Sequence, residues 1–276
     1  MGAFKLRGVT NVLGQLTPGQ QDAGVITYSS GNHGLALAVA AGQRGVHAVV
    51  VVPETIAAVK LDGIRRAGAQ VIYAGTTVID RRTRAEQESA ARGLTMVPPF
   101  DHAWIIAGAG TVGLEIAEQL PDVGTVYVPV GGGGLAAGVA TAIKLSRPAA
   151  RVIGVEPAGA AKLTASLAAG HPVTLERTAS IADGLLSLRP GDLTFAHLAQ
   201  YLDSVMTVDE SAISAAVRWL FAEARLVAEP SGAVTVAAAL ATAGDCPAPV
   251  VAIVSGGNVD ADRYIQCLNG PDTRDR

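Results

Sequence analysis

The fold class can be predicted from residues 25–44, which read VITYSSGNHGLALAVAAGQR. Residues 25–29 form a short apolar run of strand length, and residues 33–44 form a longer stretch with helical spacing of alanine and leucine. A polar cluster that contains glycine separates the two. The same order of strand, turn and helix recurs along most of the chain, which predicts an α/β protein with mostly parallel sheets.

The remaining elements follow from the same patterns. Further strands are expected at residues 47–53, 70–74, 125–130, 151–155 and 250–254, and helices at residues 57–67, 83–92, 104–119, 135–145, 211–224 and 231–241. The later strands are apolar almost throughout, as parallel strands covered on both faces are. The proline pair Pro98-Pro99 interrupts the alternation, so we expect two α/β units rather than one.

Composition excludes several classes of protein. The chain has 276 residues, of which 49% are hydrophobic and 16% charged, and its formal net charge is −3. The apolar content excludes disorder. The absence of Lys- and Arg-rich runs argues against nucleic acid and anionic membrane surfaces as partners, and residues 35–41, the longest apolar stretch, are too few to span a bilayer. With two cysteines and no signal-like segment, we expect a cytoplasmic globular protein.

A polar cluster follows the first strand. Hydroxyl, amide and backbone N–H groups at the start of a helix form a site suited to a carboxylate or a phosphate. The alternative is a simple helix cap made by Ser30 or Asn32. A cap needs only one such residue, so we favour a binding site, formed by Ser29, Ser30, Gly31, Asn32 and His33.

A glycine loop follows the strand at residues 125–130. It consists of Gly131, Gly132, Gly133 and Gly134. Successive glycines let backbone N–H groups approach an anion closely, so the loop predicts phosphate binding, whereas a tight turn without a ligand is the alternative. The loop lacks the Lys-Ser/Thr of nucleotide-binding loops, and a dinucleotide fingerprint is weakly met. Two further clusters, at residues 4–8 and 255–258, are uninformative alone.

Together, and in this order, the four clusters resemble the fold type II pyridoxal-phosphate enzymes, the tryptophan synthase β superfamily. His33 and the motifs at residues 181–184 and 228–233 are similar to the serine/threonine dehydratase and serine racemase branch. The resemblance runs from Phe4 to about Asp260. It implies a large cofactor-binding domain of residues 1–22 and 102–276 and a small domain of residues 23–101 that carries the substrate-carboxylate loop.

The resemblance also implies roles for individual residues. The catalytic residues it implies are Lys5, as the Schiff-base lysine, and Ser30. The pyridoxal 5'-phosphate ligands it implies are Phe4, Lys5, Asn32, Gly131, Gly132, Gly133, Gly134, Leu135 and Ser255. The substrate ligands it implies are Ser29, Ser30, Gly31, Asn32, His33 and Arg81. A solvated helix face would explain Arg81 equally well, because Arg82 and Arg84 lie beside it.

The reaction implied is α,β-elimination of L-threonine or L-serine to a 2-oxo acid and ammonia by a homo-oligomer. Ser30 keeps a racemase, or a mixed racemase and dehydratase, as an alternative, and it can also act only as a cap. The chain starts at the lysine segment, without the family's upstream strand and helix, so an inactive cofactor-binding remnant is a further alternative. The remaining alternative, a nicotinamide-dependent dehydrogenase, is supported by the glycine loop alone.

No metal site is expected. The racemase relatives bind a divalent cation with a glutamate, a backbone carbonyl and an acid, and Glu156 and Ala160 match the first two. Lys162 stands in place of the acid, and its ammonium group can pair with Glu156 instead. The role of Glu229, as a site residue or as a buried structural carboxylate, stays open.

Overall fold

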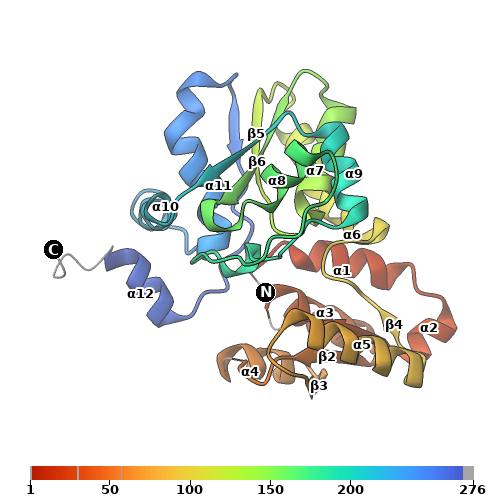
Figure 1. Cartoon of the computed structure of the whole chain (residues 1–276). Coiled ribbons are helices and arrows are strands. Elements are labelled where there is room, and N and C mark those ends of the chain that lie inside the picture. Colours follow the sequence, from red (N-terminus) through yellow and green to blue (C-terminus); the bar gives the residue numbers. More distant parts are fainter. Residues whose placement is uncertain (1, 30, 57, 270–276) are drawn as a thin grey trace. The chain divides into compact units, whose positions relative to one another are not determined.

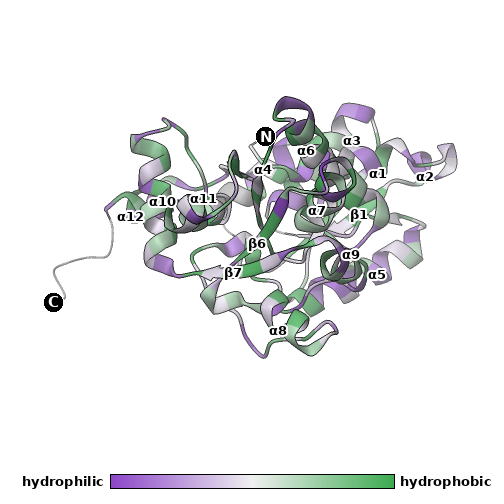
Figure 2. Ribbon diagram, turned by 90° about the horizontal axis from the view of Figure 1, so that it is seen from above, coloured by the Kyte–Doolittle hydropathy of each residue, from purple (hydrophilic) through white to green (hydrophobic). Residues whose placement is uncertain are grey.

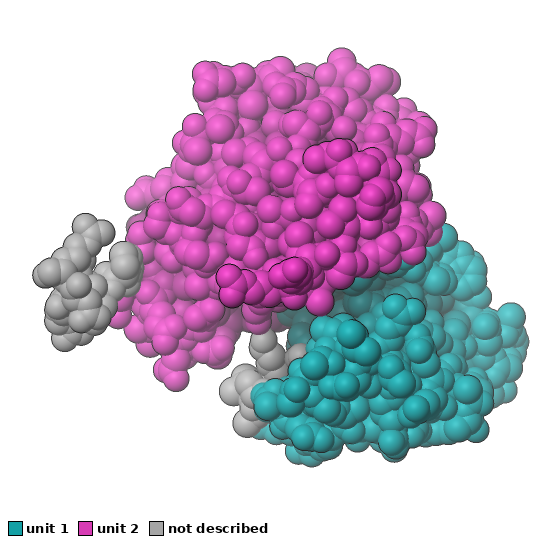
Figure 3. Space-filling model, viewed as in Figure 1, with its two compact units in different colours: residues 1, 3–108 teal, residues 2, 109–276 magenta. Residues whose placement is uncertain are grey.

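The protein is described by a computed structural model that covers residues 2–29, 31–56 and 58–269, and it divides into two compact units (Figure 3). Unit 1 contains residues 3–108, and unit 2 contains residue 2 and the residues from 109 onwards. Each unit has one four-stranded sheet whose neighbouring strands are all parallel. The predicted α/β class with parallel sheets is therefore confirmed.

Unit 1 has the sheet order β3-β2-β1-β4, and its elements can be followed in Figure 1. They are α1 (Lys5–Gly14), α2 (Pro18–Ala23), β1 (Val25–Tyr28), α3 (Asn32–Arg44), β2 (Ala48–Val52), α4 (Ala58–Arg66), β3 (Gln70–Tyr73), α5 (Val78–Arg92) and β4 (Thr95–Met96). The next helix, α6 (Ala103–Gln119), begins in unit 1 and continues past residue 108.

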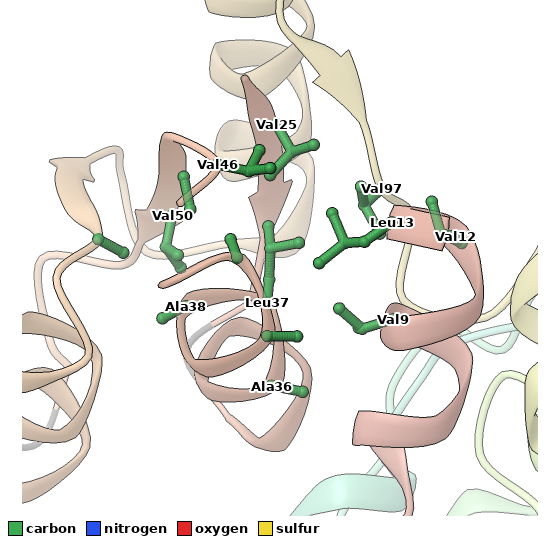
Figure 4. Packing of buried hydrophobic residues seen from close by; sticks show 14 of the residues in the cluster. Val9, Val12, Leu13, Val25, Ala36, Leu37, Ala38, Val46, Val50 and Val97 are labelled. Carbon is green, nitrogen blue, oxygen red and sulfur yellow. The ribbon is translucent and has the colours of Figure 1, made fainter. Parts of the chain in front are cut away.

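The main core of unit 1 lies between the sheet and the helices α1 and α3. Val9 and Leu13 of α1 face the side of α3 that carries Leu37, as Figure 4 shows, and all three side chains are fully buried. All five residues of β2 are buried, as expected for an inner parallel strand. Burial of these apolar side chains is the main force that holds α1 against α3.

Helix α5 has a different character. It carries only one fully buried residue, Ala85, and its charged sequence can be compared with the other helices in the hydropathy colouring of Figure 2. The helix begins at Val78, whereas the sequence predicted a charged helix that starts at about residue 83. The reason is a capping box, in which the Thr77 hydroxyl accepts from the Asp80 N–H at 3.1 Å and the Asp80 carboxylate accepts from the Thr77 N–H at 3.0 Å.

Unit 2 has the sheet order β7-β6-β5-β8. Its elements after α6 are β5 (Thr125–Pro129), α7 (Gly134–Ser146), β6 (Arg151–Pro157), the 3₁₀ turn η1 (Ala158–Ala160), α8 (Lys162–Ala169), η2 (Asp183–Leu185), α9 (Asp192–Tyr201), β7 (Ser204–Val208), α10 (Glu210–Ala222), α11 (Pro230–Thr242), η3 (Ala243–Asp245), β8 (Val250–Ala252) and α12 (Ala261–Asn269). Its core lies between the sheet and the helices α10 and α11, where Ile213, Val217 and Val234 are fully buried.

The predicted strands are all present, with ends within a few residues of those expected. The sequence pattern did not indicate the other two strands, β4 and β7. The helices α1, α2, α8, α9 and α12 were likewise not indicated. The division into a large domain of residues 1–22 and 102–276 and a small domain of residues 23–101 stays a prediction. Among the described residues, no helix is both long and apolar enough to cross a membrane.

Candidate functional site

In unit 1 the predicted loop and the lysine lie at one edge of the sheet. The loop that starts at Ser29 follows β1, and Val97 follows β4, the neighbouring parallel strand. Parallel neighbours end at the same sheet edge, the usual position of ligand sites in α/β folds. Lys5, the first residue of α1, reaches this edge, because its Nζ donates a hydrogen bond to the Pro99 carbonyl at 2.5 Å.

The surroundings of Lys5 increase the neutral fraction of its amine. Its Nζ lies 5.1 Å from the centroid of the Phe4 ring, and desolvation lowers its pKa to about 8. At pH 7 a pKa of about 8 leaves about a tenth of the amine neutral, against about three in ten thousand for the ordinary value of 10.5. Only the neutral amine can attack a carbonyl carbon, so Lys5 has the property that a nucleophilic lysine needs.

His33 lies in the same cluster and is a neutral imidazole. The side chain is 2% exposed, and its Nε2 lies 3.0 Å from the Val97 carbonyl oxygen. Because a carbonyl oxygen can only accept, Nε2 carries the proton. Burial, and then the positive charge of Lys5, lower the pKa of His33 to about 3. Its Nδ1 is a buried acceptor without a partner among the described residues.

The loop after β1 is compact where the structure describes it. The Gly31 N–H donates to Ser29 Oγ at 3.3 Å, and Asn32 is the first residue of α3. A Cβ at Gly34 would collide with the Ser29 carbonyl oxygen, so this position needs glycine. Within the described residues, no side chain caps α3. Ser30, the predicted acid–base residue, lies outside the described residues.

Arg81 lies on α5, which follows β3, and β3 is separated from β1 by β2 in the sheet. Its Nη1 donates to the Thr76 carbonyl at 3.4 Å, and its Nε is buried without a partner in the described part of the chain. Burial lowers the pKa of its guanidinium group, and the neighbouring Asp80 opposes the change. These contacts do not join Arg81 to the loop after β1, and its substrate role stays a prediction.

In unit 2 the glycine loop connects β5 to the N-terminus of α7. Gly133 is the N-cap residue of α7 with φ +99°, a conformation that favours glycine. The Gly132 carbonyl accepts from the Gly191 N–H at 3.1 Å and from Thr194 Oγ1 at 2.7 Å. No side chain of the described residues caps α7, and Leu135 is buried. The helix start therefore presents backbone N–H groups suited to a phosphate.

The cluster at residues 255–258 also lies in unit 2. Ser255 is 8% exposed, and the Gly257 N–H donates to the Gly2 carbonyl at 2.8 Å. The buried Glu229 lies against this cluster, because its N–H donates to the Gly256 carbonyl at 3.1 Å and a Cβ at Gly256 would collide with its carboxylate.

The expected pairing of Lys162 with Glu156 is present in unit 2. The two charged groups lie 3.2 Å apart, and both side chains are fully buried. Sequence reasoning missed two residues that shape these clusters, Thr194 behind the glycine loop and Pro99 beside Lys5. Thr194 carries no sequence signal because it lies inside an unremarkable helix start, and Pro99 contributes only its backbone carbonyl.

The residues present fit two groups of pyridoxal phosphate, its phosphate and its aldehyde. An uncapped helix N-terminus with a glycine loop suits its phosphate, and a desolvated lysine with a lowered pKa suits its aldehyde. His33 Nδ1, a buried acceptor that has no partner within the described part of the chain, lies in the same unit as the lysine.

Comparison with known proteins gives a consistent result. The L-threonine dehydratase biosynthetic IlvA of Escherichia coli (strain K12) is 46% identical over 235 residues, which is 85% of this chain and 46% of that protein. The chain thus spans about half the length of that relative. Its fold superposes with a TM-score of 0.93 on the processed form of threonine deaminase isoform 2 from Solanum lycopersicum, at 40% identity over 97% of this chain and 79% of that chain. Maize serine racemase gives a TM-score of 0.91 at 37% identity over 97% of this chain and 83% of that chain.

Residues 1–256 match the family described as "Pyridoxal-phosphate dependent enzyme". The match covers the first three sequence clusters and the first half of the fourth, Ser255 and Gly256, and it agrees with the fold type and the cofactor that the clusters indicated. The chain belongs to the pyridoxal-phosphate dependent enzyme family.

Proposed function

We propose that this protein eliminates ammonia from L-threonine or L-serine and releases 2-oxobutanoate or pyruvate. The observation that carries the proposal is Lys5 at the sheet edge, with its lowered pKa and its hydrogen bond to Pro99, in a chain 46% identical to a threonine dehydratase. In such a reaction the substrate loses its Cα proton and its β-hydroxyl group. Water then replaces the amino group, so that ammonia is the second product.

Each cluster has a task in this reaction. When bound, pyridoxal phosphate supplies an electron sink for the electron pair left on Cα. Lys5 would hold the cofactor through its amine, and the same amine would take the Cα proton. The N–H groups of residues 131–135 would bind the phosphate, and Ser255 would meet the pyridine nitrogen. Phe4 would stack near the ring, and Asn32 would donate to the ring oxygen.

The loop at residues 29–33 is proposed to bind the substrate carboxylate. The backbone N–H groups of Gly31 and Asn32 lie at the start of α3, where the helix dipole favours an anion. A neutral His33 suits this place because its burial beside Lys5 disfavours a second positive charge. Ser30 and Arg81 are proposed as further substrate contacts.

The proposal is tested with the purified protein and pyridoxal phosphate. We expect an absorption band of the lysine-bound cofactor that is absent in Lys5→Ala and present in Lys144→Ala, which removes a lysine on α7. Addition of L-threonine or L-serine should release ammonia and a 2-oxo acid in equal amounts. A protein that binds the cofactor in this way but turns over neither amino acid would refute the lyase activity and support an inactive remnant.

Racemisation is a second candidate, favoured by the similarity to maize serine racemase. The same incubation with L-serine decides it by chiral chromatography. D-serine formed at a rate comparable to pyruvate would indicate mixed activity, and D-serine without pyruvate would replace the lyase proposal. A Ser30→Ala variant should lose D-serine formation and retain elimination if Ser30 is the second acid–base group.

A further inference from the structure

Lys162 is the largest charged side chain buried in the described residues, and no step proposed above uses it. It is the first residue of α8, and none of its surface is exposed. A buried lysine is costly unless its three N–H donors are all paired. The contacts of its ammonium group therefore indicate what the residue does.

Four oxygen atoms surround Lys162 Nζ. It donates to three backbone carbonyls, those of Val130 at 2.8 Å, Ala160 at 2.9 Å and Leu185 at 3.0 Å. The fourth oxygen is Glu156 Oε1 at 3.2 Å. Burial lowers the pKa of Lys162, and the carboxylate of Glu156 opposes this change. The ammonium group of Lys162 is thus surrounded by oxygen atoms that accept its hydrogen bonds and balance its charge.

The residues that Lys162 Nζ binds lie at the ends of several different elements. Val130 follows β5 and directly precedes the glycine loop, Glu156 lies near the end of β6, and Leu185 ends η2. A Cβ added at Gly131 would lie 3.2 Å from the Gly184 carbonyl oxygen, so the glycine loop touches the same turn that Lys162 binds. The ammonium group therefore fixes the chain on the N-terminal side of the loop and the turn beside it.

Glu156 is anchored independently of Lys162. Its Oε1 accepts from the Leu163 N–H at 2.9 Å, and its Oε2 accepts from the N–H and the hydroxyl of Thr164, both at 2.9 Å. The carboxylate thereby caps the start of α8 and stays in place when the ammonium group is removed. Without the ammonium group, three carbonyl oxygens and a carboxylate would face one another. Because the carboxylate stays in place, the mutual repulsion would move the segments that carry the carbonyls.

We propose that Lys162 is a positioning residue for the phosphate-binding loop, because its ammonium group holds Val130 and Leu185 and so fixes residues 131–134 in the conformation that receives the phosphate. The inference rests on the proposed phosphate-binding role of this loop. Thr194 and Gly191 hold the loop at Gly132, and Lys162 holds it where it leaves β5. Both contacts are needed because glycines do not restrict the backbone themselves.

The test compares Lys162→Ala with Lys144→Ala. Lys144 is a matched control in the same unit, since its Nζ also binds a carboxylate, Asp203, at 2.7 Å and a carbonyl, Ala150, at 2.9 Å. The dissociation constants of pyridoxal phosphate and of pyridoxal, which lacks the phosphate, are measured for each protein. Lys162→Ala should bind pyridoxal phosphate about tenfold or more weakly, with little change for pyridoxal. Lys144→Ala should bind both as the wild type does.

Chemical rescue adds an independent readout. Truncation to alanine leaves a space lined by four oxygens that matches an ammonium or methylammonium ion. Either ion, added at millimolar concentration, should restore pyridoxal phosphate binding in Lys162→Ala and not in Lys144→Ala. If Lys162→Ala does not fold, the double variant Glu156→Gln/Lys162→Met removes both charges with little change of volume, and it should show the same selective loss.

Hydrogen–deuterium exchange of the cofactor-free protein separates this inference from the proposed function. Residues 131–136 should exchange faster in the Lys162 variants than in the wild type. Equal losses for pyridoxal phosphate and pyridoxal, or wild-type exchange in the loop, would overturn the positioning role. If the wild type binds neither compound, the proposed function fails, and the exchange of the loop still decides the role of Lys162.

Discussion

Substitution of Gly133 by alanine tests whether the conformation of the glycine loop requires a residue without a Cβ at this position. Gly133 has φ +99° and forms the N-cap of α7. An alanine Cβ there would lie 2.8 Å from both Cβ and Oγ1 of Thr194 and 3.1 Å from Cδ1 of Leu198. Both residues belong to α9 and are fully buried, so neither can rotate into solvent to make room.

Two costs add in Gly133→Ala. A side chain in the left-handed region costs about 1–2 kcal/mol, and forcing a methyl group into a filled space costs about 1–3 kcal/mol. The expected loss of unfolding free energy is therefore about 2–5 kcal/mol. Gly170→Ala is a matched control, because Gly170 has φ +74° and nothing lies within 4 Å of its added Cβ. It should lose only the backbone term, about 1–2 kcal/mol.

Urea unfolding of both variants, followed by far-UV circular dichroism and by Trp219 fluorescence in a Trp104→Phe background, gives the difference between them. Trp219 lies in α10 of unit 2, so its signal reports on the unit that contains the loop. We also expect weaker binding of pyridoxal phosphate by Gly133→Ala only. Equal destabilisation by the two variants, with unchanged cofactor binding, would show that the close approach of α9 does not constrain the loop.

Three further predictions concern unit 1. Covalent attachment of pyridoxal phosphate to Lys5 should accelerate as the pH rises and level off above about 8, the lowered pKa of this lysine; a profile that still rises steeply at pH 10 would contradict it. His33 has a folded pKa of about 3 against 6.5 when unfolded, so the unfolded chain binds more protons between these values and stability falls as the pH drops below about 6.5. The slope from His33 is at most about 1.4 kcal/mol per pH unit, and urea unfolding of His33→Asn between pH 4 and 6 should show a shallower decline. Thr77→Ala removes the hydroxyl of the capping box and should cost about 1 kcal/mol in urea unfolding, whereas Arg82→Ala, which breaks an exposed ion pair with Glu86, should cost a few tenths at most.

The sequence allowed most of both sheets to be predicted because their strands are short apolar runs that precede polar turns. Residues 25–29 and 125–130 are examples, and β1 and β5 coincide with them closely. Strand β7 was missed because its residues are of mixed polarity and only the last of them, Val208, is buried, so no apolar run marks the strand. Helix α1 was missed because glycine interrupts its sequence, and its burial against α3 is a tertiary effect.

For the candidate site, the sequence identified two kinds of residue. Lys5 and His33 have ionisable side chains, and the glycines allow backbone conformations that other residues disfavour. The sequence could not identify groups that act through the backbone. The Pro99 carbonyl that binds Lys5 and the Val97 carbonyl that fixes the tautomer of His33 are examples, since any residue at these positions would present the same oxygen. Their role depends on the pairing of β4 with β1, which brings the ends of two distant segments together.

The same distinction explains what could be inferred about Lys162. Its pairing with Glu156 was predictable from the resemblance, in which Lys162 stands in place of an acid that binds a cation together with a glutamate. The three carbonyl partners were not, because a carbonyl oxygen has no signature in the sequence and only the order of β5 and β6 brings them to one point. An ion pair alone would make Lys162 a structural residue of α8. The carbonyl of Val130 connects it to the glycine loop, so the function inferred for this lysine depends on the part of its surroundings that the sequence does not reveal.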